Sequence, residues 1–228
     1  MHVLPSQQAS AAANMAIDLL LLEAYPEPKL PRFRSYGWTL PAWSFGLSQK
    51  WEALHERILS LPCEVVRRPT GGGLVDHLQD WTFSLVIPPS SPGYRDNPTE
   101  LYRLVHEKAI AALSLQGLGA QLYEVANTTG LRPVCFAAAE RFDVVLPSGE
   151  KIAGAAQKRN KHGLLIQGSI TRLLPEKIDW DMFADQFAYG LGDYLGSRPE
   201  QVAWPALDEE RLASETERFA SDSWNRRH

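Results

Sequence analysis

A glycine-rich stretch beside charged side chains is a candidate ligand-binding turn. Residues 67–77 read RRPTGGGLVDH and stand between two apolar, β-branched runs. Successive glycines permit positive φ and let backbone N–H groups point at an anion. Arg68 adds a planar, charged fork that suits carboxylate or phosphate oxygens. The alternative is a tight hairpin with an exposed arginine pair, and the pattern is neither a P-loop nor a dinucleotide-binding motif.

A cysteine and a lysine further along the chain are candidates for acyl chemistry. The thiolate of Cys135 is nucleophilic and a good leaving group, so it can hold an acyl group as a thioester. Lys151 opens the return strand of a predicted hairpin, and an ammonium group close to a thiol lowers the pKa of the thiol. The alternatives are a small buried cysteine and a solvated hairpin lysine. Cys63 matches no motif and is predicted to be structural.

Two further features lie beside these candidates. The small residues 153–156, which read AGAA, leave room for a ligand against the backbone. His77 is a candidate general base or pocket hydrogen bonder, although a lone histidine is more often structural.

The elements that must position these residues alternate between helix and strand patterns. Apolar periodicity predicts helices over residues 9–25, 51–60, 100–115, 180–189 and 207–219, the last two covering the sheet. β-branched and apolar runs bounded by turn residues predict strands over residues 33–36, 42–45, 64–67, 81–88, 121–125, 142–146, 151–158 and 163–170. Residues 127–133 are predicted to be a loop that delivers Cys135 to the next strand.

Length and composition indicate a single globular domain over residues 1–228, without an accessory C-terminal domain. The chain has 228 residues, 44% of them hydrophobic, and a net charge of -4. This acidity argues against a nucleic-acid partner. No apolar run of about 18 residues and no signal peptide is present, so we expect a cytoplasmic protein without a membrane partner. Both cysteines are expected to be reduced, and no structural zinc site is expected.

The glycine-rich stretch resembles the RRxTGGGxVxH motif of the lipoate and biotin protein ligase superfamily. Residues 14–22 resemble its NMAxDxxLL motif, and residues 34–49 resemble its RFYGWxxPxxSxGxxQ motif at eight positions, Arg34, Tyr36, Gly37, Trp38, Pro41, Ser44, Gly46 and Gln49. Residues 134–136 (VCF), 151–157 (KIAGAAQ) and 219–225 (FASDSWN) resemble one branch, the cysteine-dependent octanoyltransferases of Gram-positive bacteria. The resemblance covers nearly the whole chain.

This resemblance implies an α+β fold, a mixed and largely antiparallel sheet flanked by helices. It implies that Cys135 carries the acyl group and that Lys151 polarises the substrate carbonyl and favours the thiolate. Leu74, Trp38 and residues 153–156 are expected to line an apolar slot for the acyl chain. The expected substrate-binding residues are Arg68, Gly71, Gly72, Gly73, His77, Gly154, Ala155 and Ala156, with no metal ligands.

The implied activity is transfer of an octanoyl group from octanoyl-acyl carrier protein, through a Cys135 thioester, to a lysine of a lipoyl carrier domain. Expected acceptors are the glycine-cleavage H protein or the acyltransferase subunit of a 2-oxoacid dehydrogenase. This reaction needs no cofactor. A relay enzyme that moves octanoyl between carrier proteins would share the same cysteine.

Two alternatives come from other classes. An ATP-dependent lipoate-protein ligase would form lipoyl-AMP with ATP and Mg²⁺, and Gly73 resembles the ligase pattern, whereas the VCF motif favours the transferase. A degenerate acyl-binding protein without turnover would explain the departures from the family pattern at Leu78, Ala155, Ile166 and Gln167. These departures argue against polar contacts from their positions.

Overall fold

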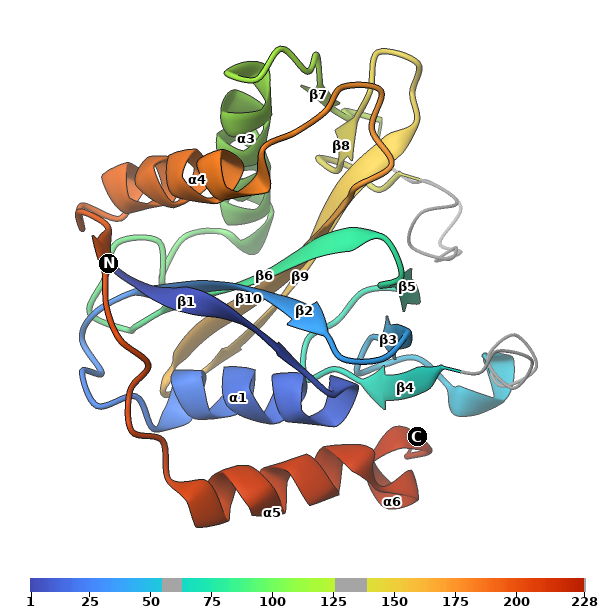
Figure 1. Cartoon of the computed structure of the whole chain (residues 1–228), viewed down its shortest axis with the longest axis vertical. Helices are drawn as coiled ribbons and strands as arrows, with labels where there is room; N and C mark the ends of the chain where they lie inside the picture. The colour runs from blue at the N-terminus through green and yellow to red at the C-terminus, as the bar shows by residue number, and fades with distance from the viewer. Residues whose placement is uncertain (55–62, 126–138, 228) are drawn as a thin grey trace.

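The protein is described by a computed structural model over residues 1–54, 63–125 and 139–227. Eight strands form one sheet in the order β11-β1-β2-β6-β10-β9-β8-β7, and three form a small second sheet in the order β4-β3-β5 (Figure 1). The strands are β1 (His2–Ala9), β2 (Arg32–Trp38), β3 (Ala42–Phe45), β4 (Glu64–Arg67), β5 (Val75–Asp76), β6 (Asp80–Ile87), β7 (Gln121–Leu122), β8 (Val144–Val145), β9 (Lys151–Asn160), β10 (Gly163–Thr171) and β11 (Glu200–Gln201). The helices are α1 (Ala11–Glu23), α3 (Pro98–Ser114), α4 (Trp180–Tyr194), α5 (Glu209–Ala220) and α6 (Asp222–Asn225), with a 3₁₀ turn η1 (Trp51–Ala53).

The large sheet is mixed and mostly antiparallel. Strand β1 pairs in parallel with β2 and with β11, whereas each pair from β2 through β7 along the sheet is antiparallel. The predicted α+β architecture is therefore confirmed.

Helix α1 crosses between the parallel strands β1 and β2. Ser10 caps it, because its hydroxyl accepts a hydrogen bond from the Ala13 N–H at 3.2 Å. The helix predicted over residues 9–25 is thus confirmed, although it is shorter at both ends. Ala9 belongs to β1 and pairs with Trp38 of β2. The helix is buried on most faces, as its apolar composition predicts.

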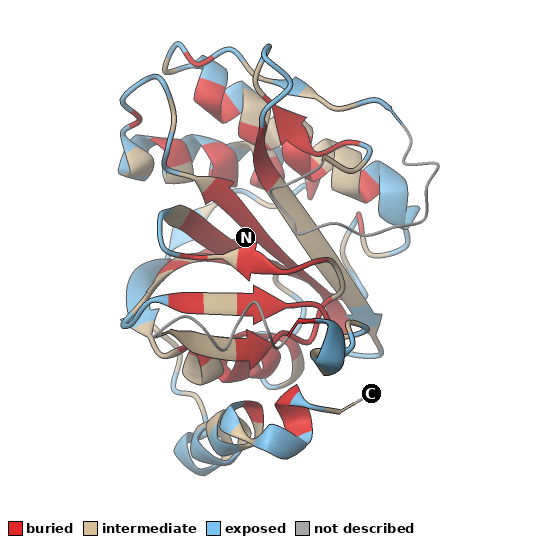
Figure 2. Ribbon diagram, turned by 90° about the vertical axis from the view of Figure 1, so that its right-hand side faces the viewer, coloured by how far each residue is buried: buried red, intermediate tan, exposed pale blue. Residues whose placement is uncertain are grey.

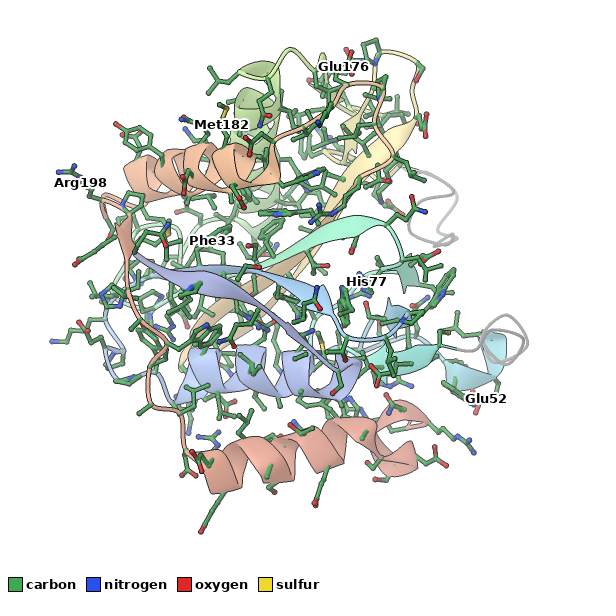
Figure 3. The ribbon with its side chains drawn as sticks, viewed as in Figure 1. Phe33, Glu52, His77, Glu176, Met182 and Arg198 are labelled. Carbon is green, nitrogen blue, oxygen red and sulfur yellow. The ribbon has the colours of Figure 1, made fainter. Side chains whose placement is uncertain are left out.

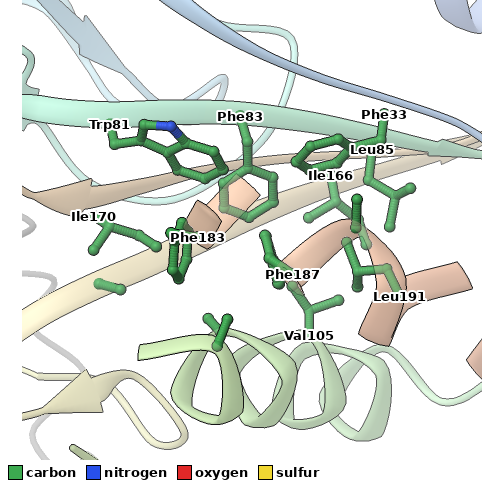
Figure 4. Packing of buried hydrophobic residues seen from close by; sticks show 14 of the residues in the cluster. Phe33, Trp81, Phe83, Leu85, Val105, Ile166, Ile170, Phe183, Phe187 and Leu191 are labelled. Atoms are coloured by element: carbon green, nitrogen blue, oxygen red, sulfur yellow. The ribbon is translucent and has the colours of Figure 1, made fainter. Parts of the chain in front are cut away.

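Alternation along β6 separates a core face from a site face. Trp81, Phe83 and Leu85 pack against α3 and α4, with the rings of Phe83 and Phe187 centred 5.1 Å apart at 85° (Figure 4). Each such buried ring contributes roughly 1.5–3 kcal/mol. The polar Thr82 and Ser84 point to the opposite face, toward α1, and build the site described below.

The helix α5 differs from its predicted place. Its range is close to the predicted 207–219, but it lies on the outer side of α1 rather than on the sheet (Figures 1 and 2). Phe219 is the one buried residue of α5, and it packs with Ala11 and Met15. The rest of the helix is too charged to cover an apolar sheet face. The prediction that α4 covers the sheet is confirmed.

Other differences concern short or irregular strands. The sequence did not indicate β1, β5 or β11, and β7 and β8 are each two residues long rather than five. The strand β1 begins buried and is more exposed from Pro5 onward, so it lacks regular alternation. Within the predicted helix 51–60, only η1 is described, and the predicted loop 127–133 lies outside the described residues.

Candidate active site

The glycine-rich turn joins β4 to β5 and is held by Arg68. The Nη2 group of Arg68 donates to the carbonyl oxygens of Gly71 at 2.8 Å and Gly73 at 2.7 Å. Of the three glycines, Gly72 alone has a positive φ, at +87°, and a Cβ there would lie 2.7 Å from Arg68 Nη2. The freedom of glycine to adopt positive φ is therefore used at Gly72. Arg68 organises this turn, and its contact with substrate stays a prediction.

The turn rests directly on the end of β3. A Cβ at Gly46 would lie 2.1 Å from the Gly72 carbonyl oxygen, so that position accepts only glycine without a backbone shift. The Leu47 N–H donates to the Thr70 carbonyl at 2.8 Å and fixes the same approach. Gly46 was quoted in the family motif but was not predicted to support the turn.

Arg67, the other arginine of the motif, binds the C-terminal segment. It is fully buried, and its Nη2 donates to the carbonyl oxygens of Asn225 at 2.8 Å and Arg227 at 2.7 Å. Trp224 Nε1 donates to the Arg67 carbonyl at 2.7 Å. The resemblance at residues 219–225 thus has a structural reason, because this segment secures the strand that leads into the glycine turn.

Lys151 is buried rather than solvated, with 7% of its surface exposed. Its Nζ lies 2.7 Å from Asp143 Oδ2. The Asp143 carboxylate also accepts from the Tyr102 hydroxyl and, at 2.6 Å, from the Glu140 N–H. A buried ammonium group with a matched carboxylate is a fixed charge that can act on a ligand.

Gly154 makes room for the Lys151 side chain. A Cβ at Gly154 would lie 3.1 Å from both Cε and Nζ of Lys151 and 3.2 Å from Asp143 Oδ1. The small residue predicted to leave space for a ligand therefore leaves space for the catalytic candidate itself.

Two pockets meet along β9. The smaller one has a mainly apolar surface, and the larger one is more polar. The larger one is lined by Lys151 and the turn residues Gly71, Gly72 and Gly73. Ala155 and Ala156 line both pockets, so they mark the junction.

Some of the residues predicted to line an acyl slot lie at the smaller pocket, and the binding of an acyl chain there stays a prediction. Trp38, Gly154, Ala155 and Ala156 line the smaller pocket, together with Met15, Tyr36, Ser44, Arg68, Val75, His77, Thr82, Gln167, Gly168 and Ser169. Leu74 and Ala153 were wrongly included. Leu74 is buried against Phe45 and Leu54, and Ala153 belongs to the core on the other face of the sheet.

Gln167 makes polar contacts that its departure from the family pattern did not predict. Its Oε1 accepts from the Thr70 hydroxyl at 2.7 Å, and its Nε2 donates to Asp18 Oδ2 at 2.7 Å. Asp18 is fully buried and forms an ion pair with Arg34 at 2.8 Å. The glycine-rich loop is thereby tied to α1 through one side chain of β10. Ile166 is buried in the core on the opposite face.

His77 lies between β3 and β6, at the wall of the smaller pocket (Figure 3). Its Nδ1 is 2.6 Å from Asp80 Oδ2 and its Nε2 is 2.7 Å from Ser44 Oγ. Its ring stacks on Trp38 with centroids 4.1 Å apart. The predicted role as a pocket hydrogen bonder agrees with this position. The carboxylate that contacts His77 belongs to Asp80. Leu78, which stands where the family pattern has an aspartate, has a side chain that is 55% exposed.

The two cysteines differ in what the structure describes. The predicted nucleophile Cys135 lies outside the described residues. Cys63 is a half-buried free thiol, and burial, with a smaller contribution from Asp76, raises the pKa of this thiol. A raised pKa disfavours the thiolate, which agrees with a structural Cys63.

Solved structures with this fold are lipoate protein ligases. The bipartite lipoate protein ligase of Thermoplasma acidophilum, studied with its E2 lipoyl domain, has a TM-score of 0.74 at 18% identity, covering 99% of this chain and 95% of that one. A lipoate-protein ligase A bound with ATP has a TM-score of 0.75 at 18% identity, covering 99% and 97%. At this identity the likeness shows the fold.

Curated relatives are more similar in sequence. Octanoyltransferase LipM of Anoxybacillus flavithermus is 36% identical over 188 residues, which cover 78% of this chain and 67% of that protein. LipM of Bacillus subtilis is 35% identical over 193 residues, with coverages of 78% and 67%. The matched region thus spans about two thirds of the length of these relatives.

The fold of the described residues is that of lipoate protein ligases. The family model for the lipoyl protein ligase A/B catalytic domain matches residues 10–187. This chain belongs to that family. Among the helices of the described residues, none has the length and hydropathy needed to cross a membrane.

Proposed function

We propose that this protein transfers an octanoyl group from octanoyl-acyl carrier protein, through a thioester on Cys135, to a lysine of a lipoyl carrier domain. The observation that carries the proposal is the buried Lys151–Asp143 pair on the wall of the larger cavity, which shares Ala155 and Ala156 with the apolar pocket. The relatives named octanoyltransferase LipM support it.

The two pockets suit the two ends of an acyl thioester. The smaller pocket has Met15, Tyr36 and Trp38 on its wall and takes the hydrocarbon chain. Binding there is favourable because it removes the apolar surface of the chain from water. The thioester carbonyl then lies near Ala155 and Ala156, where Lys151 stabilises developing negative charge on the oxygen.

The chemistry proceeds by two acyl transfers that balance. The Cys135 thiolate attacks the thioester carbonyl, and the carrier leaves as a thiolate that takes up the proton released when the Cys135 thiol ionised. The amine of the acceptor lysine then attacks the Cys135 thioester, forming an amide and restoring the thiol. We propose the glycine-cleavage H protein or the acyltransferase subunit of a 2-oxoacid dehydrogenase as acceptors, a cytoplasmic location, and no cofactor.

The ligase alternative would place ATP and Mg²⁺ in the larger cavity. Lys151 and Arg141 on its wall would attract phosphate, but Asp143 and Glu140 line the same wall, and Asp143 already pairs with Lys151. The intact pair around Lys151 also argues against a degenerate protein without turnover.

Transfer to an isolated lipoyl domain tests the proposal. With octanoyl-acyl carrier protein and no ATP, the lipoyl domain should gain one octanoyl group, and Lys151→Met should abolish the gain. Modification that occurs only with free octanoate, ATP and Mg²⁺ would overturn the transferase in favour of the ligase.

A further inference from the structure

Ser44 and His77 at the wall of the apolar pocket, with Asp80 behind His77, form a nucleophile, a base and an orienting carboxylate. Ser44 Oγ lies 2.7 Å from His77 Nε2, and His77 Nδ1 lies 2.6 Å from Asp80 Oδ2. We propose that Ser44 is a second acyl acceptor that does not depend on Cys135 and hydrolyses medium-chain acyl thioesters and esters. This activity goes beyond the proposed transferase.

The hydrogen-bond partners of Asp80 and Ser44 suit one assignment of donor and acceptor along the Ser44–His77–Asp80 chain. Asp80 accepts hydrogen bonds from Thr82 Oγ1 at 3.0 Å and from the Ser169 hydroxyl, so its carboxylate is held in place. In the tautomer that the proposal requires, His77 Nδ1–H donates to Asp80 and His77 Nε2 accepts from the Ser44 hydroxyl. Arg68 Nη1 donates to Ser44 Oγ at 3.0 Å, which leaves the serine hydrogen for His77.

Hydrogen bonds that run from Ser44 to His77 and from His77 to Asp80 are the arrangement that activates a serine. The base lies within hydrogen-bond distance of the hydroxyl, and a third group orients the base. The Arg68 guanidinium next to Ser44 stabilises negative charge that develops during attack. The strong burial of Ser44 and His77, 2% and 8% exposed, keeps these interactions largely out of bulk water.

The position of Ser44 suits an acyl substrate. Ser44, Arg68 and His77 line the same pocket as Trp38 and Ala156, and most of the surface of that pocket is apolar. A medium-chain acyl group bound there has the serine hydroxyl beside it. Ser44 does not line the larger cavity around Lys151.

The proposed reaction balances in two steps. The Ser44 oxygen attacks the acyl carbonyl while His77 Nε2 takes its proton, and the leaving thiol or alcohol takes that proton from His77. Water then attacks the Ser44 ester with His77 as base, releasing the fatty acid and restoring the serine. Asp80 acts as a positioning residue through His77.

An alkyl fluorophosphonate, which labels activated serines, tests this directly on the full chain carrying Cys135→Ala. Peptide mapping should place one adduct on Ser44, and hydrolysis of 4-nitrophenyl octanoate should fall at least about 100-fold in Ser44→Ala. The exposed-turn control Ser148→Ala should retain both signals. Asp80→Asn should displace the ionisation in the rate–pH profile, which a purely structural role would not do.

The labelling result decides the proposal even if Ser44→Ala fails to fold, because it uses the unsubstituted serine. No adduct on Ser44, or an unchanged hydrolysis rate in a folded Ser44→Ala variant, would overturn it. Since Cys135 is absent and no carrier protein is added, the outcome is independent of the transferase reaction.

Discussion

The ammonium group of Lys151 and the carboxylate of Asp143 form a buried ion pair with Nζ 2.7 Å from Oδ2. The two residues are eight positions apart, on β9 and just before β8, and β8 and β9 pair in antiparallel fashion with a register shift between Val144 and Val145. The pair gives the lysine a fixed place at the wall of the larger cavity.

Removing one partner of this pair should be strongly destabilising. Asp143→Asn leaves the Lys151 ammonium buried without its counter-charge, which costs about 3–5 kcal/mol of unfolding free energy. The double variant Asp143→Asn/Lys151→Met should be more stable than Asp143→Asn alone. Urea unfolding measures both, and Arg103→Ala, which breaks an exposed pair with Glu100, should cost less than about 1 kcal/mol. Additive effects of the two buried substitutions would contradict the pairing.

Gly154→Ala should impair catalysis more than stability. The added Cβ would sit 3.1 Å from Lys151 Nζ, and the flexible end of the lysine can shift by a few tenths of an ångström to accommodate it. We expect octanoyl transfer to fall at least about 10-fold, which corresponds to about 1.4 kcal/mol of activation free energy. Gly119→Ala, whose Cβ would have its nearest contact at 3.9 Å, is the matched control. Equal rates in the two variants would disprove the steric argument.

Gly46→Ala should destabilise the glycine turn. Its Cβ would lie 2.1 Å from the Gly72 carbonyl oxygen, and backbone cannot yield as a side chain does. An overpacked contact of this kind costs about 1–3 kcal/mol. Thermal and urea unfolding should show this loss, and limited proteolysis should show faster cleavage near residues 68–74. A fully stable variant would mean that the turn has another backbone position available.

The pH dependence of stability should carry a contribution from His106. This ring is buried and stacks edge-on against Tyr102, and burial, with a smaller contribution from Lys151, lowers its pKa from 6.5 to about 4. Between these values the unfolded chain binds a proton that the native protein does not. Stability is therefore complete above about pH 6.5 and is lost as the pH falls toward 4, by on the order of 3 kcal/mol.

His106→Leu isolates that contribution, because it removes the titrating group and leaves the carboxylates unchanged. The difference in unfolding free energy between the two proteins should change between pH 7 and pH 4.5 in favour of the variant. Parallel stability curves would show that His106 does not titrate in this range.

Local patterns predicted two strands of the small sheet and the candidate charged residues of the site. Strands 42–45 and 64–67 are short apolar or β-branched runs bounded by turn residues, and both agree with the structure residue for residue. Lys151 and the glycine turn stand out because their residue types and neighbours are unusual. The two-residue strands β5 and β11 carry no such signal, since pairing with a neighbour defines them.

The residues that contact Lys151, Ser44 and His77 could not be predicted from the sequence. Asp143 is an ordinary acidic residue between Phe142 and Val144 until the β8–β9 hairpin folds, and Ser44 meets His77 only through the pairing of β3 with β5. Leu78, in place of the common aspartate, pointed to a lost carboxylate, although Asp80 supplies one to His77. Long-range register decides these contacts, and one sequence does not encode it in any local pattern.

The most direct measurement is the intact mass of the purified protein after incubation with octanoyl-acyl carrier protein alone. The transferase account predicts a gain of one octanoyl group that neutral hydroxylamine removes, as it removes a thioester. This hydroxylamine-labile adduct should be absent from Cys135→Ala and retained in Cys63→Ala. No adduct in the unsubstituted protein, together with ATP-dependent modification of a lipoyl domain that survives Cys135→Ala, would contradict the account.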